Sequence, residues 1–325
     1  MNPRLTPLAA ALSIAFVAPA QAQTADLDPV IVSATRFSEP DTNVAANVSV
    51  ITRDDIRNTP ARDLPSMLKG SAGVDVRALY GSLGIDSTID IRGFGETAGS
   101  NTLILLDGQR LNPIDMGSVS WSAIPLDSVQ RIEIMRGAGT VLYGDKATGG
   151  VVNIITDKSG APRAGATVGI GSYDTQTVDL NGAFGNDIGY ANAFARYAHT
   201  GGWRENSQAE QAALSGRGGL YIGKGEAFID YSVYNDHSGL PGYLLSAAYQ
   251  NNPKTSTSPT DSQRSDGYRL RPGVALPITD TLRFEAEVSY DRQNQHANYA
   301  SFGSQAGPEP KKTPPADVVG TQDFR

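Results

Sequence analysis

The sequence predicts an α+β domain followed by the antiparallel strands of a transmembrane β-barrel. Two observations support this fold class. Up to about residue 158, short β-branched strands are broken at Gly-rich corners, and two short helical patterns precede them. From residue 164 onward, longer runs alternate between apolar and polar residues, and tight connections alternate with long ones.

Composition limits the functional classes. The chain has 325 residues, a net charge of −7, no cysteine and no block of Lys or Arg, which argues against a nucleic-acid partner. Its histidines, His199, His237 and His296, lie on separate segments without a close-spaced carboxylate pair. We therefore expect no enzyme activity, no cofactor and no metal site; a haem or metal role for these histidines is the alternative to plain surface residues.

Residues 1–22 have the features of a secretory signal peptide. Arg4 supplies a positive charge, Leu8–Ala18 is apolar, and Ala20-Gln21-Ala22 is a small-x-small cleavage site. No later segment offers the roughly 18 apolar residues that a membrane helix needs. If the mature protein lies in a membrane, we expect it to do so as a closed β-barrel.

Residues 23–46 form a polar lead that contains one short apolar segment. That segment comprises Asp28, Pro29, Val30, Ile31, Val32, Ser33 and Ala34. Such a segment can add as a strand to the open edge of another protein's sheet, with backbone hydrogen bonds supplying the affinity. The alternative is an edge strand of the following domain, and both roles are compatible in a resting state.

The domain predicted over residues 47–158 opens with alternating strands and helices. Asn47–Ile51 reads as a strand, and Thr52-Arg53-Asp54-Asp55 as a capping box that begins a short helix. A second helix is expected over Ala61–Lys69, ending at Gly70, and Gly73–Arg77 reads as a strand.

The most informative stretch is Ser87–Lys158. Asp107-Gly108 between apolar runs predicts a tight hairpin, because a primed turn requires positive φ at both central residues. Arg92, Arg131 and Arg136 lie in or beside short strands, where an unpaired charge is costly. The motifs, in order, are DIRGFG (90–95), LLDGQRLN (105–112), RIEIMRG (131–137), LYG (142–144) and GGVVNIIT (149–156).

In this order, over about seventy residues, the motifs resemble the plug domain of TonB-dependent outer-membrane receptors for siderophores and cobalamin. The alternative is an ordinary small α+β domain with chance Gly corners. The resemblance implies a receptor in the Gram-negative outer membrane, a monomer in contact with outer-membrane lipid. Residues 28–34 would be the Ton box, which pairs with TonB and its inner-membrane energising complex. The ligand would be an iron-siderophore, with cobalamin as the alternative.

The resemblance also implies roles for plug residues. Arg92 and Arg136, with Glu133, are expected to anchor the plug to barrel carboxylates; the alternative is pairing of the arginines with Asp90, Asp107 or Glu133 inside the plug. The polar segments 78–86, 96–101 and 112–119 are expected to rise as apices toward the ligand, or else to be solvated turns. The candidate ligand-binding residues are Tyr80, Gly81, Ser100, Met116 and Trp121.

Residues 164–325 are expected to be the first part of the barrel. The positions expected to face lipid are Leu282, Phe284, Ala286, Val288 and Tyr290, then Ala227, Ile229, Tyr231 and Val233, and less cleanly Val178, Leu180 and Phe184. The positions that alternate with them and are expected to face a wet lumen are Arg283, Glu285, Glu287 and Asp291, and Asp230 and Ser232. The candidate strands are 164–172, 174–184, 188–199, 210–222, 225–236, 266–276 and 281–292.

Seven strands are too few to enclose a plug, because a plugged barrel has about 22. The last residues, Gly320–Arg325, do not read as the closing strand with a final aromatic residue that such barrels end in. We therefore expect the N-terminal portion of a longer receptor, with an incomplete barrel. The alternative from another functional class is a non-transporting fragment or a passive binding surface.

Overall fold

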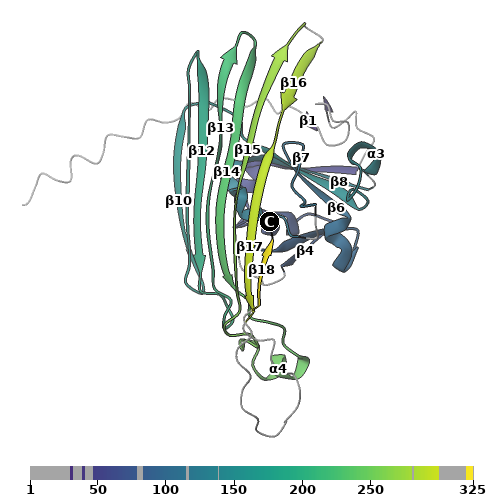
Figure 1. Ribbon diagram of the computed structural model, residues 1–325, viewed down its shortest axis with the longest axis vertical. Coiled ribbons are helices and arrows are strands. Elements are labelled where there is room, and N and C mark those ends of the chain that lie inside the picture. The colour runs from purple at the N-terminus through teal and green to yellow at the C-terminus, as the bar shows by residue number, and fades with distance from the viewer. Residues whose placement is uncertain are drawn as a thin grey trace, which may run out of the picture.

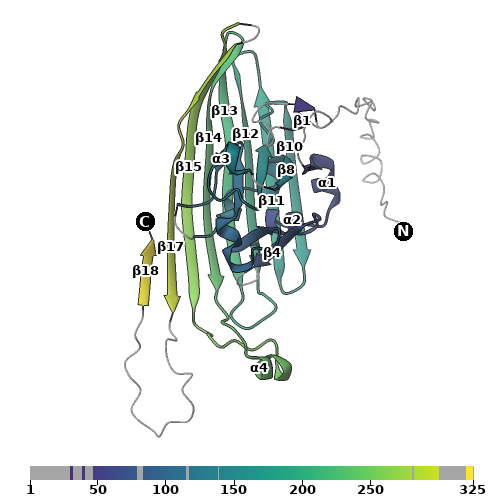
Figure 2. The same ribbon diagram turned by 90° about the vertical axis from the view of Figure 1, so that its right-hand side faces the viewer.

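The computed structural model describes residues 47–78, 83–114, 117–137, 139–279 and 282–299, and the backbone of short strands at 30–31, 39–40 and 320–324. The first part of the chain folds into a domain of short strands and helices, here called the inner domain (residues 47–156). The second part, here called the wall (residues 163–324), is a tall sheet with the inner domain packed against one face (Figure 1, Figure 2).

A five-stranded sheet forms the centre of the inner domain. Its strand order is β3-β8-β9-β6-β7, and only the β6–β9 pair is parallel. Two further strands, β4 and β5, form a separate hairpin. The strands are β3 (Asn47–Thr52), β4 (Val74–Ala78), β5 (Ser87–Ile91), β6 (Thr102–Leu106), β7 (Gln109–Arg110), β8 (Val129–Arg136) and β9 (Gly150–Thr156).

The hairpin predicted at Asp107-Gly108 is confirmed. Asp107 has φ 51° and Gly108 has φ 83°, and the turn joins β6 to β7. Gly150 is required for a different reason, since a Cβ there would lie 2.5 Å from the carbonyl oxygen of Met135 on the neighbouring strand. The paired glycines of the GGVVNIIT motif therefore allow β9 to pack closely in the sheet.

The helices follow their capping residues. The predicted capping box begins α1 (Arg53–Asn58): Thr52 N donates to Asp55 Oδ2 (2.8 Å), and Asp55 N to Thr52 Oγ1 (3.2 Å). The second helix, α2 (Leu64–Lys69), ends at Gly70 as expected but begins three residues later than Ala61, because Asp63 is its N-cap. Further helical segments among the described residues of the inner domain are η2 (Gly95–Ser100), η3 (Trp121–Ala123), η4 (Leu126–Ser128) and α3 (Thr140–Tyr143).

Apolar side chains cover both faces of the five-stranded sheet. On one face, α1, α2 and the β4–β5 hairpin contribute to a core that includes Leu68, Ile91, Ile132 and Ile134, all fully buried. On the other face, a smaller cluster forms around Met135. None of the helices in the described ranges combines the length and apolar composition needed to span a membrane.

All neighbouring strands of the wall are antiparallel. They run in the order β10 to β15, then β17 and β18, and β16 pairs with β15 beside β17. The strands are β10 (Arg163–Gly171), β11 (Thr175–Gly185), β12 (Gly189–Thr200), β13 (Ala209–Ile222), β14 (Gly225–Gly239), β15 (Ser262–Pro277), β16 (Arg283–Glu287), β17 (Tyr290–Tyr299) and β18 (Gly320–Phe324).

The expectation of one continuous strand over 281–292 is wrong. Residues 288–289 separate β16 from β17, and both strands pair with β15 in one unbroken register. Pro272 of β15 lies opposite the gap and has no N–H to donate to the ladder. The segment Gly320–Phe324 is also a strand, paired with β17, which the sequence analysis did not predict.

The connections at the two ends of the wall differ in length. Residues 186–188, 223–224 and 278–282 connect strands at one end, and residues 201–208 and 240–261 at the other, the latter containing α4 (Ser246–Asn251) (Figure 1). The expected alternation of tight turns and long loops is therefore present. One connection at the long-loop end is short, because Tyr173 and Asp174 both adopt positive φ in a tight turn.

The two faces of the wall have opposite chemistry. The cross-strand register places Leu180, Ala195, Leu214, Val233 and Tyr268 in one row on the face away from the inner domain. Phe284 and Ala286 lie opposite Leu276 and Val274 on that same outer face. The face toward the inner domain instead carries buried polar and charged side chains. The predicted division between outward apolar and inward polar positions is confirmed for these strands.

We predict that Ile134→Ala destabilises the inner domain by about 2–5 kcal/mol, because it removes a fully buried side chain and leaves a cavity. Hydrogen exchange of the β8 amides, measured on the assembled protein, would be faster by the corresponding factor. Val141→Ala is the control, since Val141 is 95% exposed. Equal exchange in both variants would contradict the assignment of β8 to the core.

Candidate functional site

The inner domain is attached to the wall by polar contacts, and this interface, here called the seam, is the candidate functional site. Strands β11 to β15 each supply at least one side chain to it. Typical bonds are Asn181 Nδ2 to Asp127 Oδ2 (3.2 Å), Arg196 Nη2 to Arg62 O (2.6 Å), Gln211 Nε2 to Leu83 O (2.9 Å), Ser232 Oγ to Ala123 O (2.7 Å) and Gln263 Nε2 to Asp86 Oδ2 (2.6 Å).

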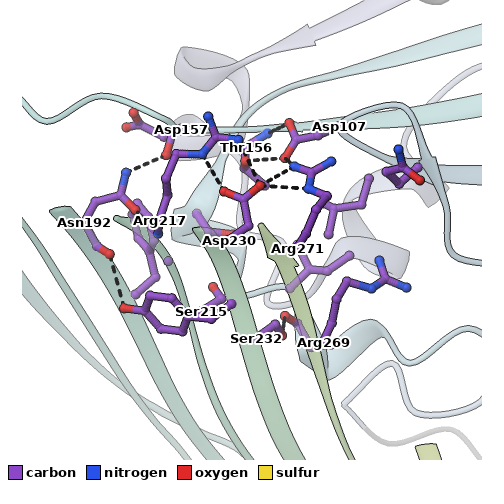
Figure 3. A pocket seen from close by; sticks show the side chains of 18 residues that line it. Asp107, Thr156, Asp157, Asn192, Ser215, Arg217, Asp230, Ser232, Arg269 and Arg271 are labelled. Carbon is purple, nitrogen blue, oxygen red and sulfur yellow. Dashed lines mark hydrogen bonds and ion pairs between the residues drawn. The ribbon is translucent and has the colours of Figure 1, made fainter. Parts of the chain in front are cut away.

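At the centre of the seam lies a cluster of buried charges (Figure 3). Asp230 on β14 accepts from Arg217 on β13 (Nε to Oδ1, 2.5 Å; Nη2 to Oδ2, 2.8 Å) and from Nε of Arg271 on β15 (2.8 Å). Arg271 also reaches the inner domain, with Nη2 3.2 Å from Asp107 Oδ2. Arg217 stacks on the Phe228 ring at 3.9 Å. Both arginine side chains are only 5% exposed, so the cluster holds its charges in pairs away from water.

Asp107 connects this cluster to the hairpin turn of the inner domain. Its carboxylate accepts from Thr156 N (3.0 Å) and Thr156 Oγ1 (2.6 Å), and Lys158 Nζ lies 3.3 Å away. Burial alone would raise the pKa of Asp107, but the charges of Lys158 and Arg271 and the bonds from Thr156 outweigh it, and the pKa lies below its ordinary value of 3.8. Asp107 is therefore held in its charged form.

Asp157 fixes the connection between the two bodies. Its Oδ2 lies 2.5 Å from Arg53 Nη1 on α1 and 2.9 Å from Arg163 Nη2 at the start of β10. Asn192 Nδ2 on β12 donates to the backbone carbonyl of Asp157 (2.9 Å). One residue thus links the first helix of the inner domain to two strands of the wall.

Two cavities lie along the interface. The smaller, about 50 Å³, sits against the charged cluster and is bordered by Asp107, Arg217 and Arg271 (Figure 3). The larger, about 950 Å³, lies between residues 110–114 and Gly117 of the inner domain and strands β14, β15 and β17. Its two arginines already have acidic partners: Arg110 pairs with Asp145 (2.7 Å), and Arg269 pairs with Asp291. Gln293 and Gln295 add neutral amides to its lining.

The expected TonB-binding segment is described only in part. Val30 and Ile31 form strand β1, which pairs with β2 (Glu39–Pro40). Asp28, Pro29 and Val32, Ser33 and Ala34 lie outside the described residues.

The expected anchoring residues lie within the inner domain. Arg136 donates to Ala72 O (2.8 Å) and to Ser49 Oγ (2.6 Å), and the guanidinium of Arg92 lies over Gly137. Glu133 is fully buried and pairs with Arg131 (2.9 Å), so this internal contact replaces the expected contact with the wall. A role for Arg92 and Arg136 toward further strands stays a prediction.

Of the expected ligand-binding residues, the structure describes only Ser100 and Trp121. Tyr80, Gly81 and Met116 lie outside the described residues, and Ser100 is exposed at the end of η2. Trp121 is only 4% exposed, and its indole N–H donates to Ser87 O (2.7 Å) in the core of the inner domain. The expectation that Trp121 faces a ligand is therefore corrected to a packing role.

The three histidines lie on strands rather than loops. Cross-strand pairing places His199, His237 and His296 in one row on the outer face, separated by Glu210 and Arg264. They point away from the inner domain, so they do not line the lumen. The described residues contain no group of three or more His, Asp or Glu side chains placed to hold a metal ion.

The residues that do join the two bodies were only partly recognised in the sequence. Alternation along the strand predicts that Asp230 and Ser232 face the lumen. It does not identify Arg217 and Arg271 as contact residues. The available signal was a charged residue at an inward position of an otherwise apolar strand. Which inner-domain group each would meet was not readable, because Asp107 and Arg271 are 164 positions apart.

The comparisons agree with this architecture. Residues 40–151 match the family described as TonB-dependent Receptor Plug Domain. A curated relative, the vitamin B12 transporter BtuB of Vibrio cholerae serotype O1, is 39% identical over 155 residues, which are 47% of this chain and 24% of the transporter. The matched part of the chain thus covers about a quarter of the length of these curated relatives.

Solved structures show the same fold. The ferric citrate transporter FecA has a TM-score of 0.70 at 21% identity, covering 79% of this chain and 41% of FecA. The ferripyoverdine receptor of the outer membrane of Pseudomonas aeruginosa has a TM-score of 0.73 at 15% identity, covering 87% of this chain and 38% of that receptor.

We predict that Asp107→Asn weakens the seam by about 3 kcal/mol at neutral pH, because it leaves Lys158 and Arg271 without this buried partner. Since the pKa of Asp107 is lowered, its contribution is complete above the ordinary value of 3.8 and is lost as the pH falls through the lowered value. Hydrogen exchange of the Thr156 amide, which bonds Asp107, reports the change.

Asp145→Asn is the matched control, because it removes a carboxylate of an exposed Arg pair and should leave this exchange unchanged. Equal protection of Thr156 in wild type and Asp107→Asn would show that the charged cluster does not hold the inner domain.

Proposed function

Because the chain belongs to the TonB-dependent receptors, we propose that it acts in active uptake of a scarce, bulky ligand across the Gram-negative outer membrane. The inner domain would be the plug, and the wall would lie in lipid with its apolar face outward, in a monomeric receptor. The observation that carries this proposal is the seam: a compact domain seated on the polar face of an amphipathic sheet through hydrogen bonds and ion pairs.

A plug that must yield during transport is best held by polar contacts. Water entering the lumen can replace each hydrogen bond of the seam, whereas an apolar interface would resist separation in water. The inner domain keeps its own apolar core, so it can separate from the wall without exposing that core. These features support gating by movement of the plug.

Residues 28–34 would be the Ton box, the segment through which TonB supplies the energy for transport. In this proposal TonB, driven by its inner-membrane complex, adds this segment to its own sheet and pulls. The pairing of β1 with β2 supports a strand-forming tendency of Val30 and Ile31. Within the inner domain, β3 and α1 come first in the chain, and Arg53 of α1 contacts the junction residue Asp157.

Two ligand classes are candidates. A ferric siderophore is the expectation from the sequence, and cobalamin or a related corrinoid is favoured by two observations. The relative with 39% identity is a vitamin B12 transporter. In addition, the arginines lining the larger cavity are already paired with acids, and its free polar groups are neutral amides, which suit an amide-rich corrinoid better than an anionic iron complex.

We predict that Ile31→Pro in the full receptor abolishes ligand uptake while leaving ligand binding at the cell surface unchanged, because proline removes a backbone donor and disrupts strand addition. Ile31→Val is the matched control and should transport normally. Loss of surface binding in Ile31→Pro, or normal uptake, would contradict the role of residues 28–34.

The ligand is tested by growth. In a strain without other corrinoid uptake, we expect the intact receptor gene to support growth on limiting cobalamin, and to give no advantage on iron-limited medium with ferric siderophores. If the receptor gene improves growth only with ferric siderophores, the corrinoid is rejected and a ferric siderophore is the ligand.

A further inference from the structure

The seam contains two carboxyl groups, the partly buried Asp86 and the buried Asp236, that have no basic partner among the described residues. Asp86 belongs to the turn at residues 83–86, and its Oδ2 accepts from Gln263 Nε2 on β15 (2.6 Å). Asp236 lies on the inner face of β14, and its Oδ2 accepts from Ser122 Oγ of the inner domain (2.5 Å). Among the described residues, neither carboxyl forms an ion pair with Lys or Arg.

This arrangement differs from the neighbouring acids of the same interface. Asp107 is paired with Lys158 and Arg271, and Asp230 with two arginines. The donors to Asp86 and Asp236 are instead neutral amides and hydroxyls. A buried carboxylate without a cation is costly, and the usual response is that the group takes up a proton.

The surroundings of Asp236 favour protonation of its carboxyl group. The side chain is 6% exposed, and its second oxygen, Oδ1, is buried without a hydrogen-bond partner among the described residues. A protonated carboxyl would convert an acceptor into a donor. Asp86 lies close enough for its charge to act on Asp236. Two like charges in a dry site cannot both form at low cost.

No basic group in the part of the chain that the structure describes faces the pair from the elements packed around it. β13 contributes Gln211, β14 contributes Tyr234 and Ser238, and β15 contributes Gln263 and Ser265. The inner domain contributes the hydroxyls of Ser118 and Ser122, and a third acid, Asp63, which lies beside Gly84. Tyr234 is a further titratable group, and its hydroxyl bonds Ser120 (2.7 Å). His237 follows on β14 but faces outward.

We propose that Asp86 and Asp236 are a positioning pair that holds one proton while the turn at 83–86 is seated on the wall, and that loss of this proton releases the turn. The proposal goes beyond uptake itself. It depends on the packing of the inner domain against the wall and not on which ligand is carried.

The direction of the pH dependence follows from the buried state. Burial raises the pKa of Asp86 above its ordinary value, although hydrogen bonds from Gln263 and Ser118 act in the opposite sense. The seated turn therefore binds the proton more tightly than the released turn does. Seating is strongest below the ordinary pKa of 3.8, weakens by about a factor of ten for each pH unit between that value and the raised pKa, and changes no further above the raised pKa.

The turn leads directly into β5, whose first residue, Ser87, accepts the indole N–H of Trp121 through its carbonyl. Gln211 donates to the carbonyl of Leu83 at the start of the same turn (2.9 Å). Release at this point would therefore free one end of the β4–β5 hairpin while the Asp107–Arg271 contact stays in place.

The test uses a nitroxide label at Leu83→Cys in the full receptor reconstituted in lipid, with spectra recorded from about pH 5 to about pH 9. We expect the ratio of mobile to immobile label to rise with pH through a single midpoint, by up to about tenfold per pH unit, and to level off once the pH exceeds the raised pKa. In Asp86→Asn and in Asp236→Asn, one acid is replaced by a neutral amide that needs no proton. Both variants should remain immobile over the whole range, without a midpoint.

Two controls separate this mechanism from general loosening. Asp107→Asn removes a buried acid of the same interface that is already charged, and it should leave the midpoint in place. A label at Glu96→Cys on the exposed η2 should not respond to pH. If Asp236→Asn does not assemble, Asp86→Asn alone decides.

Three results would overturn the proposal: a wild-type spectrum that does not change with pH, the same midpoint in both Asn variants, or a midpoint that disappears when Ca²⁺ or Mg²⁺ is replaced by a chelator. The last result would show that a cation, and not a proton, neutralises the pair. A receptor that fails to transport but keeps the midpoint would refute the proposed function and leave this inference intact.

Discussion

The structure depends on how buried charge is neutralised between the inner domain and the wall. Asp107, Asp230, Arg217 and Arg271 form one connected set, in which each arginine contacts a carboxylate and one arginine spans the two bodies. Removing any one member would leave a buried charge without one of its partners, at a cost of several kcal/mol. Position and register of the inner domain are therefore specified by charge pairing more than by apolar contact.

The same constraint explains the two faces of the wall. A sheet whose inner face must supply arginines, carboxylates and amides to the inner domain can place apolar residues only at alternate positions, and these all point outward. The outer rows of Leu180, Leu214 and Val233 are exposed in this chain. A contiguous apolar face of this size is unfavourable in water, which supports the proposal that this surface lies against lipid.

The local features of the fold were readable from the sequence, and the long-range ones were not. The Asp107-Gly108 turn and the Thr52–Asp55 capping box follow from backbone geometry at adjacent residues, so their chemistry is visible in the sequence itself. Alternation likewise assigned Asp230 and Ser232 to the inner face. The interruption after β16 was missed because its cause, Pro272, lies on the neighbouring strand.

The candidate site was harder to predict for the same reason. The resemblance pointed to Arg92, Arg136 and Glu133 of the inner domain as anchors. In the described strands, the spanning cation is instead Arg271 of the wall, and the acid, Asp107, belongs to the inner domain. The burial of Trp121 could not be predicted from the sequence either, because Trp121 lies in a polar stretch. Only the folded domain brings the carbonyl of Ser87 to its indole N–H.

The most direct test of the account is a lipid-accessibility scan along β14. The chain contains no cysteine, so single Cys substitutions from residue 226 to residue 233 each introduce one label site. With nitroxide labels in lipid, collision with oxygen should be high at Ala227, Ile229, Tyr231 and Val233 and low at Glu226, Phe228, Asp230 and Ser232. A uniform profile, or one with the opposite phase, would contradict a wall that presents its apolar face to lipid and its polar face to the inner domain.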